Sequence, residues 1–280
     1  MKTKIIWISS YPKSGNTWMR YLISNYFFNK DDGFDEKIIN NINNFPKDAF
    51  FHPFIKKEEI FSNIYSSPPY WIKAQENIET STGNIFLKTH NSMCQLNNDS
   101  FTNEDLTSAV ILIVRDPRDV VISYSNFTGE TIDQNIKFMT SKKLVHRIDR
   151  NRGNYVPEFI GSWKFNYLSW KKSLPNTPKI IVRYEDLLNN PNREFEKVIR
   201  FLSLILNFRI DPEQIKLSVN LSDFKTLQSY EKNNGFFESS KHGVFFREGK
   251  TQQWKKKLNN RQIKLLEKTF YEEMKELKYL

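Results

Sequence analysis

The sequence has one cysteine, no long apolar run and no internal repeat. A lone thiol, Cys94, excludes disulfides within the chain and zinc clusters, so we expect a reducing, cytoplasmic setting. No apolar run reaches the roughly 18 residues that a membrane-spanning helix needs. Only four apolar residues follow Lys4, which is too few for the core of a secretory signal. We therefore expect neither a transmembrane segment nor a signal peptide.

Positive charge exceeds negative charge, but it is spread along the chain. The 42 Lys and Arg residues and the 32 Asp and Glu residues give a formal net charge of +10. Such a balance suits nucleic acid, an anionic surface or a highly charged small ligand. The most basic stretch, WKKKLNNRQIK at residues 254–264, is typical of a solvated helix start. A nucleic-acid or anionic-surface binding protein is thus one alternative, although we expect no nucleic acid as a partner.

Short apolar runs alternate with amphipathic stretches along the 280 residues. The pattern predicts strands at residues 4–9, 85–89, 109–114 and 179–182, and helices at residues 16–28, 157–173, 192–206 and 261–277. This alternation favours an α/β fold with a central, mostly parallel sheet flanked by helices. We predict a single domain over residues 1–280. The polar segments 31–81 and 142–156 are expected to be insertions or loops over the edge of the sheet where ligands bind.

The stretch SSYPKSGNTWMRYLIS, residues 9–24, joins the first predicted strand to the first predicted helix. Amide groups at such a helix start point at one spot, where the helix dipole favours an anion. Gly15 permits close backbone approach and Lys13 supplies a charge. The loop lacks the second glycine, and the lysine before Ser or Thr, of the magnesium-nucleotide motif GxxxxGK[ST]. A P-loop nucleotide kinase and a plain capped turn remain as alternatives.

A second segment, VILIVRDPRDVVISYSNF at residues 110–127, places Arg115 at the carboxyl end of a predicted strand and Ser123 on the following helix. Ligands bind at this edge of open α/β sheets, so Arg115 is a candidate ligand of an anion. The alternative is that Arg115 pairs with Asp116 or Asp119 on a solvated turn.

Several segments together resemble the sulfotransferase family that uses 3′-phosphoadenosine-5′-phosphosulfate (PAPS) as donor. YPKSGNTW at residues 11–18 resembles the 5′-phosphosulfate loop YPKSGTTW, and VRDPRDVVISY at residues 114–124 resembles the 3′-phosphate segment. The other similar segments, in the order of the family, are KTH at 88–90, GSWKFNYLSW at 161–170, VRYEDLLNNP at 182–191 and FFREGKTQQWKK at 245–256. The resemblance implies a P-loop NTPase-like fold, PAPS as co-substrate and no metal.

The resemblance also implies a role for each matching residue. Lys13 meets the bridging and sulfuryl oxygens, where negative charge grows as the phosphate leaves. The implied donor-binding residues are Ser14, Gly15, Asn16 and Thr17 on the 5′ side, Arg115, Ser123, Arg247 and Gly249 at the 3′-phosphate, and Trp18, Tyr184, Ser222, Phe224 and Phe246 around the adenine. Ser123 also belongs to the implied catalytic set. Trp18 as a core aromatic stays an alternative, because it begins the apolar stripe of its helix.

Four positions depart from the pattern of the family. Asn16 replaces a threonine, and Glu248 stands where the family usually has lysine, which puts a carboxylate beside the expected phosphate site. We expect Lys250 to compensate if Glu248 points outward. Gln252 and Gln253 replace the usual Gly-Asp before Trp254.

His90 is the candidate general base, because it closes the strand-like run NIFLKTH at residues 84–90. Alternation along a strand sends Lys88 and His90 to the same side. Lys88 would stabilise the transferring oxygens while His90 takes the proton of the acceptor. A histidine that merely satisfies a loop is the alternative.

The acceptor is the least defined part of the prediction. We expect a small-molecule, glycan or lipid hydroxyl, or an amine, and aromatic residues of segment 31–81 as walls of its cleft. The residues expected to contact the acceptor are Phe51, His52 and His90, with Phe50, Phe54, Tyr70 and Trp71 as further candidates. The oligomeric state stays open.

Overall fold

The computed structural model describes residues 3–29, 33–144, 146–147 and 156–280. The chain folds into two compact units, each built from three segments. Unit 1 comprises Met1–Tyr11, Ile42–Leu112 and Lys142–Ile181, and unit 2 comprises Pro12–Asn41, Ile113–Ser141 and Val182–Leu280. The single domain stays a prediction, and most of the predicted insertion 142–156 lies outside the described residues.

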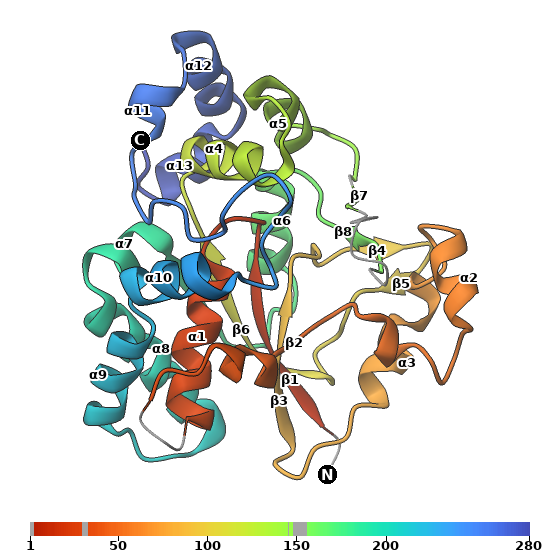
Figure 1. The fold of residues 1–280 in the computed structure, drawn as a ribbon. Coiled ribbons are helices and arrows are strands. Elements are labelled where there is room, and N and C mark those ends of the chain that lie inside the picture. The colour runs from red at the N-terminus through yellow and green to blue at the C-terminus, as the bar shows by residue number, and fades with distance from the viewer. Residues whose placement is uncertain (1–2, 30–32, 145, 148–155) are drawn as a thin grey trace. The chain divides into compact units, whose positions relative to one another are not determined.

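Unit 1 is built on a sheet with the strand order β2-β3-β1-β6-β9. The strands are β1 (Lys4–Ser10), β2 (Asn43–Asn44), β3 (Asn84–Thr89), β6 (Thr107–Val114) and β9 (Lys179–Arg183), the last residues of β6 and β9 passing into unit 2. β3 lies between β1 and β2 and pairs with both in parallel (Figure 1). The predicted strands and parallel α/β class are confirmed, whereas β2, inside the predicted insertion 31–81, was not expected.

The centre of unit 1 is packed around Trp7 of β1. Residues 5–10 of β1 are all buried, which is typical of a central parallel strand covered on both faces. The ring of Trp7 lies 5.8 Å from that of Phe45, 5.3 Å from Phe101 and 5.9 Å from Trp170. These rings fix β1 against α6 (Trp163–Lys172), and thereby the strand end that leads to Ser10.

The helix predicted at residues 157–173 begins only at Trp163. The expectation was wrong for its first residues, because Glu158–Phe159 forms β8, paired with β7 (His146–Arg147). Ser162 caps α6 by accepting a hydrogen bond from the amide of Phe165 at 3.0 Å. The other short elements of unit 1 are β4 (Gln95–Leu96), β5 (Asp99–Ser100), η2 (Asp48–Phe50), α2 (Lys57–Ser62), η3 (Pro68–Tyr70) and α3 (Trp71–Glu76).

Unit 2 is mostly helical. Its helices are α1 (Asn16–Phe28), η1 (Glu36–Asn41), α4 (Pro117–Thr128), α5 (Ile132–Met139), α7 (Tyr184–Asn189), α8 (Pro191–Leu206), α9 (Pro212–Leu221), α10 (Phe224–Asn234), α11 (Trp254–Lys257), α12 (Asn260–Thr269) and α13 (Tyr271–Glu276). α9 lies beside both α1 and α8 (Figure 1). The helices predicted at 16–28 and 192–206 are confirmed, but the one predicted at 261–277 is divided in two at Phe270.

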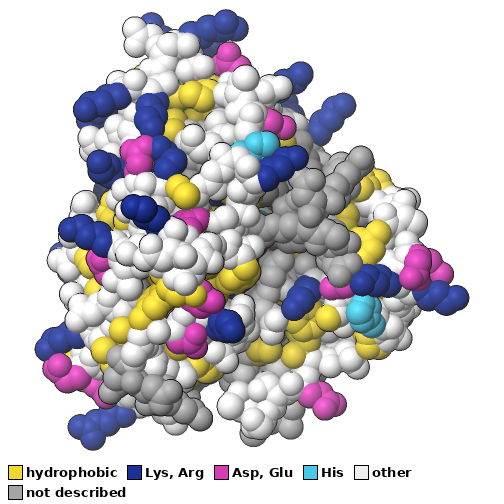
Figure 2. Space-filling view, viewed as in Figure 1, with side chains coloured by type: hydrophobic (Ala, Val, Ile, Leu, Met, Phe, Trp, Pro, Cys, Tyr) yellow, Lys and Arg dark blue, Asp and Glu magenta, His cyan; other side chains and the backbone are white. Residues whose placement is uncertain are grey.

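The surface carries charges of both signs. On the face drawn in Figure 2, Lys and Arg side chains are scattered, with Asp and Glu side chains among them. This distribution differs from the continuous basic patch of a typical nucleic-acid binding surface. Within the part of the chain that the structure describes, no helix has the length and apolar character required to cross a membrane.

Candidate active site

The loop between β1 and α1 opens unit 2 and turns sharply. Lys13 and Gly15 both have positive φ angles, 66° and 103°. A Cβ atom on Gly15 would lie 2.7 Å from Cδ2 of Tyr184, so this position requires glycine for both its conformation and its space. The loop can therefore pass close to the tyrosine ring and to any ligand beside it.

The aromatic residues expected around the adenine gather next to this loop. The rings of Trp18 and Tyr184 meet edge to face, 5.9 Å apart, and Nε1 of Trp18 donates to the carbonyl oxygen of Ser222 at 2.9 Å. The rings of Phe224 and Phe246 lie 6.2 Å apart. Unit 2 therefore brings the residues predicted for the adenine into contact in two groups, one of them directly on the loop.

Among the buried hydrogen-bond donors without a partner in the described residues are two that were predicted to bind the donor. They are Oγ of Ser14 and Nε of Arg115, whose residues are 0% and 7% exposed. The other nitrogens of Arg115 donate to the carbonyl oxygens of Lys13 and Lys250, each at 3.1 Å, and its guanidinium lies 4.2 Å from the ring centroid of Tyr184. A buried donor without an acceptor is costly, so these two atoms fit an anionic ligand such as the phosphates of PAPS.

The charge of Lys13 is held over aromatic rings. Its Nζ atom lies 3.7 Å from the ring centroid of Phe245 and 4.4 Å from that of Phe127. Such cation–π contacts keep an ammonium group in place without neutralising it. Two aromatic rings of unit 2 thus position the ammonium group of Lys13.

A carboxylate holds the threonine of the loop. Oγ1 of Thr17 donates to Glu238 at 2.8 Å, and the second carboxylate oxygen of Glu238 pairs with Arg20 at 2.5 Å. Sequence reasoning missed Glu238, because nothing in the segment 235–243 marks one acidic residue as a neighbour of the loop. The hydroxyl of Thr17, which was expected to bind the donor, is thus hydrogen-bonded to a carboxylate of the chain itself.

The segment that contains Arg247 makes a second such contact. One terminal nitrogen of Arg247 is paired with Glu248, and the other donates to Oε1 of Gln253 at 2.8 Å. Burial, and then the nearby charge of Arg115, lower the pKa of the Arg247 guanidinium. Glu248 therefore points toward the cations Arg247 and Lys257 (2.9 Å from its Oε1), so the outward orientation under which Lys250 was expected to compensate is not found.

Gly249 and Ser123 complete the residues expected at the 3′-phosphate. Gly249 has a φ of 57°, and an added Cβ would lie 2.7 Å from Phe224. Ser123 lies half-buried on α4. Asp119, which the sequence offered only as an alternative partner of Arg115, accepts hydrogen bonds from the amides of Gln252 at 2.7 Å and Trp254 at 3.1 Å. The backbone of residues 252–254 is thus anchored whatever side chains stand at 252 and 253.

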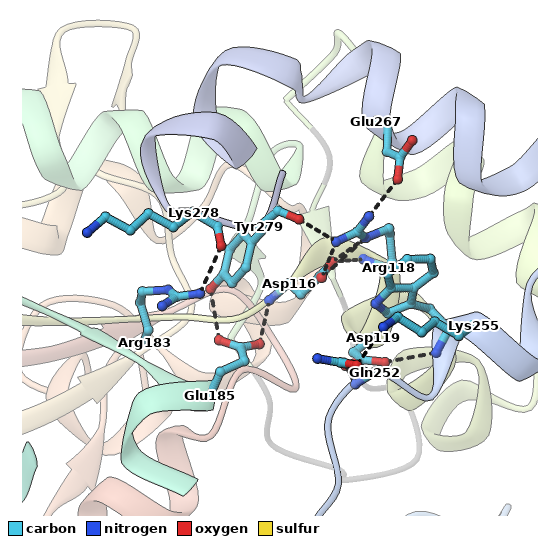
Figure 3. A network of polar contacts seen from close by, with 11 residues as sticks. Asp116, Arg118, Asp119, Arg183, Glu185, Gln252, Lys255, Glu267, Lys278 and Tyr279 are labelled. Carbon is cyan, nitrogen blue, oxygen red and sulfur yellow. Dashed lines mark hydrogen bonds and ion pairs between the residues drawn. The ribbon is translucent and has the colours of Figure 1, made fainter. Parts of the chain in front are cut away.

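A polar network fixes the start of α4, directly after Arg115 (Figure 3). The carboxylate of Asp116 accepts from the amide of Arg118 at 2.9 Å and pairs with its guanidinium at 2.7 Å. Arg118 also donates to the carbonyl oxygen of Tyr279 at 2.8 Å, while Glu185 accepts from the amide of Asp116 and the hydroxyl of Tyr279. Burial raises the pKa of Glu185. The alternative in which Arg115 pairs with Asp116 is therefore wrong, because Asp116 pairs with Arg118.

His90 lies in unit 1 at the end of β3, and its ring is oriented by β1. Nδ1 lies 2.9 Å from the carbonyl oxygen of Ser10 and 3.2 Å from the hydroxyl oxygen of the same residue. A carbonyl oxygen only accepts hydrogen bonds, so Nδ1 carries the proton and Nε2 is the acceptor nitrogen of the neutral ring. The backbone is held too, since the amide donates to Glu158 at 3.1 Å and the carbonyl oxygen accepts from Asn166 at 3.0 Å. This tautomer is the one that a proton acceptor at Nε2 requires.

Lys88 is buried beside the same carboxylate. Its Nζ lies 3.9 Å from Oε1 of Glu158 and donates to Oδ1 of Asn44 at 3.0 Å. Glu158 is fully buried, and its carboxylate is one partner of the charge of Lys88 in unit 1. Sequence reasoning missed Glu158 because it was assigned to a helix start.

The two acceptor candidates in segment 31–81 have different surroundings. Phe51 has no exposed surface and packs 5.6 Å from the ring of Phe45. His52 is exposed and lies 3.7 Å from a carboxylate oxygen of Asp48. Phe51 thus belongs to the core of unit 1, and the role of both residues toward an acceptor stays a prediction.

A group of three or more His, Cys, Asp and Glu side chains able to hold a metal ion is not found in the described ranges. Burial raises the pKa of the lone thiol, Cys94, to about 12. Cys94 is therefore a protonated core residue at neutral pH.

Comparison with known proteins gives one consistent result. A family model described as Sulfotransferase domain matches residues 3–278. Cytosolic sulfotransferase 1 of Danio rerio is 24% identical over 281 residues, which cover 96% of this chain and 82% of the relative. Flavonol 3-sulfotransferase of Flaveria bidentis is 23% identical over 278 residues, which cover 96% of this chain and 81% of the relative.

Solved structures with the same fold include two complexes with PAP. Retinol dehydratase in complex with retinol and PAP has a TM-score of 0.63 at 18% identity, over 98% of this chain and 82% of that one. A mouse sulfotransferase complexed with PAP has a TM-score of 0.59 at 18% identity, over 97% of this chain and 84% of that one.

Proposed function

The chain belongs to the sulfotransferase family, and we propose that it transfers the sulfuryl group of PAPS to the hydroxyl group of a small-molecule acceptor. Family membership favours this activity over the nucleotide kinase and the nucleic-acid binding protein. The observation that supports PAPS as donor is the pair of buried donors without a partner, Oγ of Ser14 and Nε of Arg115, beside a loop that carries Lys13. PAPS would supply the sulfuryl group and leave as 3′-phosphoadenosine-5′-phosphate (PAP).

Donor binding is assigned to residues of unit 2. Ser14, Gly15 and Thr17 hold the 5′ side through amides and hydroxyls, and the edge-to-face pair of Trp18 and Tyr184 accommodates the adenine. The hydroxyl of Thr17 gives up its hydrogen bond to Glu238 when the donor binds. The charge of Lys13, held over Phe127 and Phe245, stabilises the oxygens on which negative charge grows as the leaving group departs.

Proton transfer is assigned to His90 in unit 1. The hydrogen bond from Nδ1 to the carbonyl oxygen of Ser10 keeps Nε2 unprotonated in the neutral ring, so that Nε2 accepts the proton of the attacking hydroxyl. Lys88, held by Glu158 and Asn44, supplies a second fixed positive charge. Ser10, Glu158 and Asn166 thus hold the ring and backbone of His90 without a ligand.

The acceptor class is proposed from the relatives. Several of them are named for small hydroxyl compounds, among them a flavonol, a hydroxysteroid and luciferin. Small alcohols and phenols are therefore the first acceptors to test, and glycans and lipids follow.

The test is a transfer assay with PAPS that carries a labelled sulfuryl group. The purified chain is incubated with a panel of phenols, alcohols, glycans and lipids, and mass spectrometry detects the labelled product together with PAP. We expect transfer to at least one small hydroxyl acceptor. A parallel arm with ATP and magnesium tests the kinase, and phosphoryl transfer there, with none from PAPS, would contradict the proposal.

A further inference from the structure

Two cations of unit 2 pair with the carboxylate of Glu248, and the charge of a third, Arg115, acts on one of them. Arg247 precedes Glu248 in the chain and pairs with its Oε1 atom, and Lys257 of α11 lies 2.9 Å from the same oxygen. Burial, and then the charge of Arg115 at the end of β6, lower the pKa of Arg247. Burial, and then the charge of Arg247, lower the pKa of Lys257. The cations therefore lie close enough together to repel one another.

The charges of this cluster are not balanced by Glu248 alone. Glu248 brings one negative charge against the two positive charges of Arg247 and Lys257, while Arg115 acts also on the carboxylates of Asp119 and Glu185. A phosphate monoester carries a charge of about −1.5 to −2 near neutral pH. The buried Nε of Arg115 also lacks a partner among the residues that the structure describes. Arg247 and Lys257 thus carry more positive charge than Glu248 balances, and Nε of Arg115 can donate to a phosphate group.

The contacts of Glu248 are of the kind that a ligand displaces easily. The side chains of Arg247, Glu248 and Lys257 are 27%, 30% and 40% exposed. Ion pairs with this exposure contribute little to stability, because water screens them. A phosphate can present more oxygens to the same cations than one carboxylate oxygen does.

The backbone explains why Lys257 reaches this position. Gln252 has a positive φ of 57°, and the carboxylate of Asp119 accepts from the amides on either side of the turn, those of Gln252 and Trp254. The turn leads into α11, and Lys257 at its last position comes back to Glu248. Lys255 faces the other way, since its Nζ donates to Gln252 at 2.7 Å.

We propose that Lys257 is a further ligand of the 3′-phosphate of the donor nucleotide, and that Glu248 holds the cations of this site until the phosphate displaces it. The proposal rests on the proposed function, because it takes PAPS and PAP as the nucleotides that bind. Lys257 then decides between nucleotides with and without a 3′-phosphate. Glu248 weakens the binding of a nucleotide that must displace it, and this effect is largest for nucleotides with a 3′-phosphate.

The test measures the binding of PAP and of 5′-AMP, which lacks the 3′-phosphate, by isothermal titration calorimetry. Lys257→Met should lower the affinity for PAP about tenfold, because it removes a charge-assisted contact. The affinity for 5′-AMP should change less than twofold. The matched control is Lys256→Met, which removes the same charge from an exposed position of the same helix and should change neither affinity by more than twofold. Glu248→Gln should tighten PAP about threefold.

Each other outcome is decisive. Unchanged PAP affinity in Lys257→Met, or equal weakening by Lys256→Met, would overturn the assignment of Lys257. Weaker PAP binding in Glu248→Gln would overturn the displacement of Glu248. A wild-type chain that binds neither nucleotide would contradict the proposed function itself, and circular dichroism melting curves would confirm that each variant is folded.

Discussion

In unit 1, the ring and backbone of His90 are held by Ser10, Glu158 and Asn166, whereas in unit 2 Oγ of Ser14 and Nε of Arg115 are buried without a hydrogen-bond partner in the described part of the chain. The histidine is oriented by its own chain, but the anion loop leaves donors for a ligand to complete. On the proposed function, the two units would therefore govern different steps. Changes in unit 1 should alter turnover, and changes in unit 2 should alter donor binding.

The largest effect is expected for His90→Ala. Removal of a positioned proton acceptor lowers turnover by about 10²–10⁴-fold, while the affinity for PAP should stay the same. The control is His242→Ala, which removes an exposed histidine of unit 2 and should leave turnover unchanged. Turnover with an alcohol acceptor, measured at saturating donor, checks the prediction. A variant that keeps near-normal turnover would place the base elsewhere, with His52 as the next residue to test.

Lys13→Met should come second. Loss of a charge aimed at oxygens on which negative charge develops costs about 10²–10³-fold in turnover. Methionine keeps an apolar side chain against Phe127 and Phe245, so the fold should persist. The control Lys137→Met removes an exposed charge from α5 of the same unit. If both variants lost activity equally, Lys13 would act only through the net charge.

The first strand and helix could be predicted because local signals sufficed. An apolar run without alternation gave β1, and the loop ending at Gly15 gave the start of α1 at Asn16. Glu158 was assigned to a helix because its strand partner lies in segment 142–156, whose polar sequence gave no strand signal. Pairing between distant segments is not visible in local patterns.

The environment of Glu248 shows a second limit of sequence reasoning. Lys250 is the nearer lysine in the sequence, but the turn at Gln252 and the anchor at Asp119 bring Lys257 to the carboxylate instead. Glutamine itself does not indicate the positive φ at 252, and only the glycine usual at this position in the family points to it. The residue types of the donor segments were predictable, and their partners were not.

Gly15→Ala tests whether the backbone of the loop in unit 2 is required for donor binding. The new methyl group would lie 2.7 Å from Cδ2 of Tyr184, and the φ of 103° disfavours any L-residue with a side chain. PAP affinity should fall about tenfold. The matched control is Gly83→Ala in unit 1, which also has a positive φ, 71°, but has nothing within 4 Å of the new atom. Its stability should fall by about 1–2 kcal/mol, with PAP affinity unchanged, so equal losses of affinity in both would assign the effect to stability alone.

The smallest effect is expected for Glu238→Gln, and it has the opposite sign. In the structure, Glu238 accepts the hydroxyl hydrogen bond of Thr17 and pairs with Arg20, so its carboxylate competes with the phosphates for the loop. The neutral amide binds Thr17 less strongly and removes a negative charge beside an anion site. PAP affinity should therefore rise about threefold, even though Arg20 loses its ion pair and the melting temperature falls.

The control for this variant is Glu213→Gln, which removes the same charge from an exposed ion pair with Lys216 at the start of α9. A rise in PAP affinity of similar size in Glu213→Gln would show that net charge alone is responsible. A fall in Glu238→Gln would mean that the carboxylate orients Thr17 for the donor instead of competing with it. In that case unit 2, like unit 1, would orient its site residues before the ligand arrives, and the contrast between the units would rest on Ser14 and Arg115 alone.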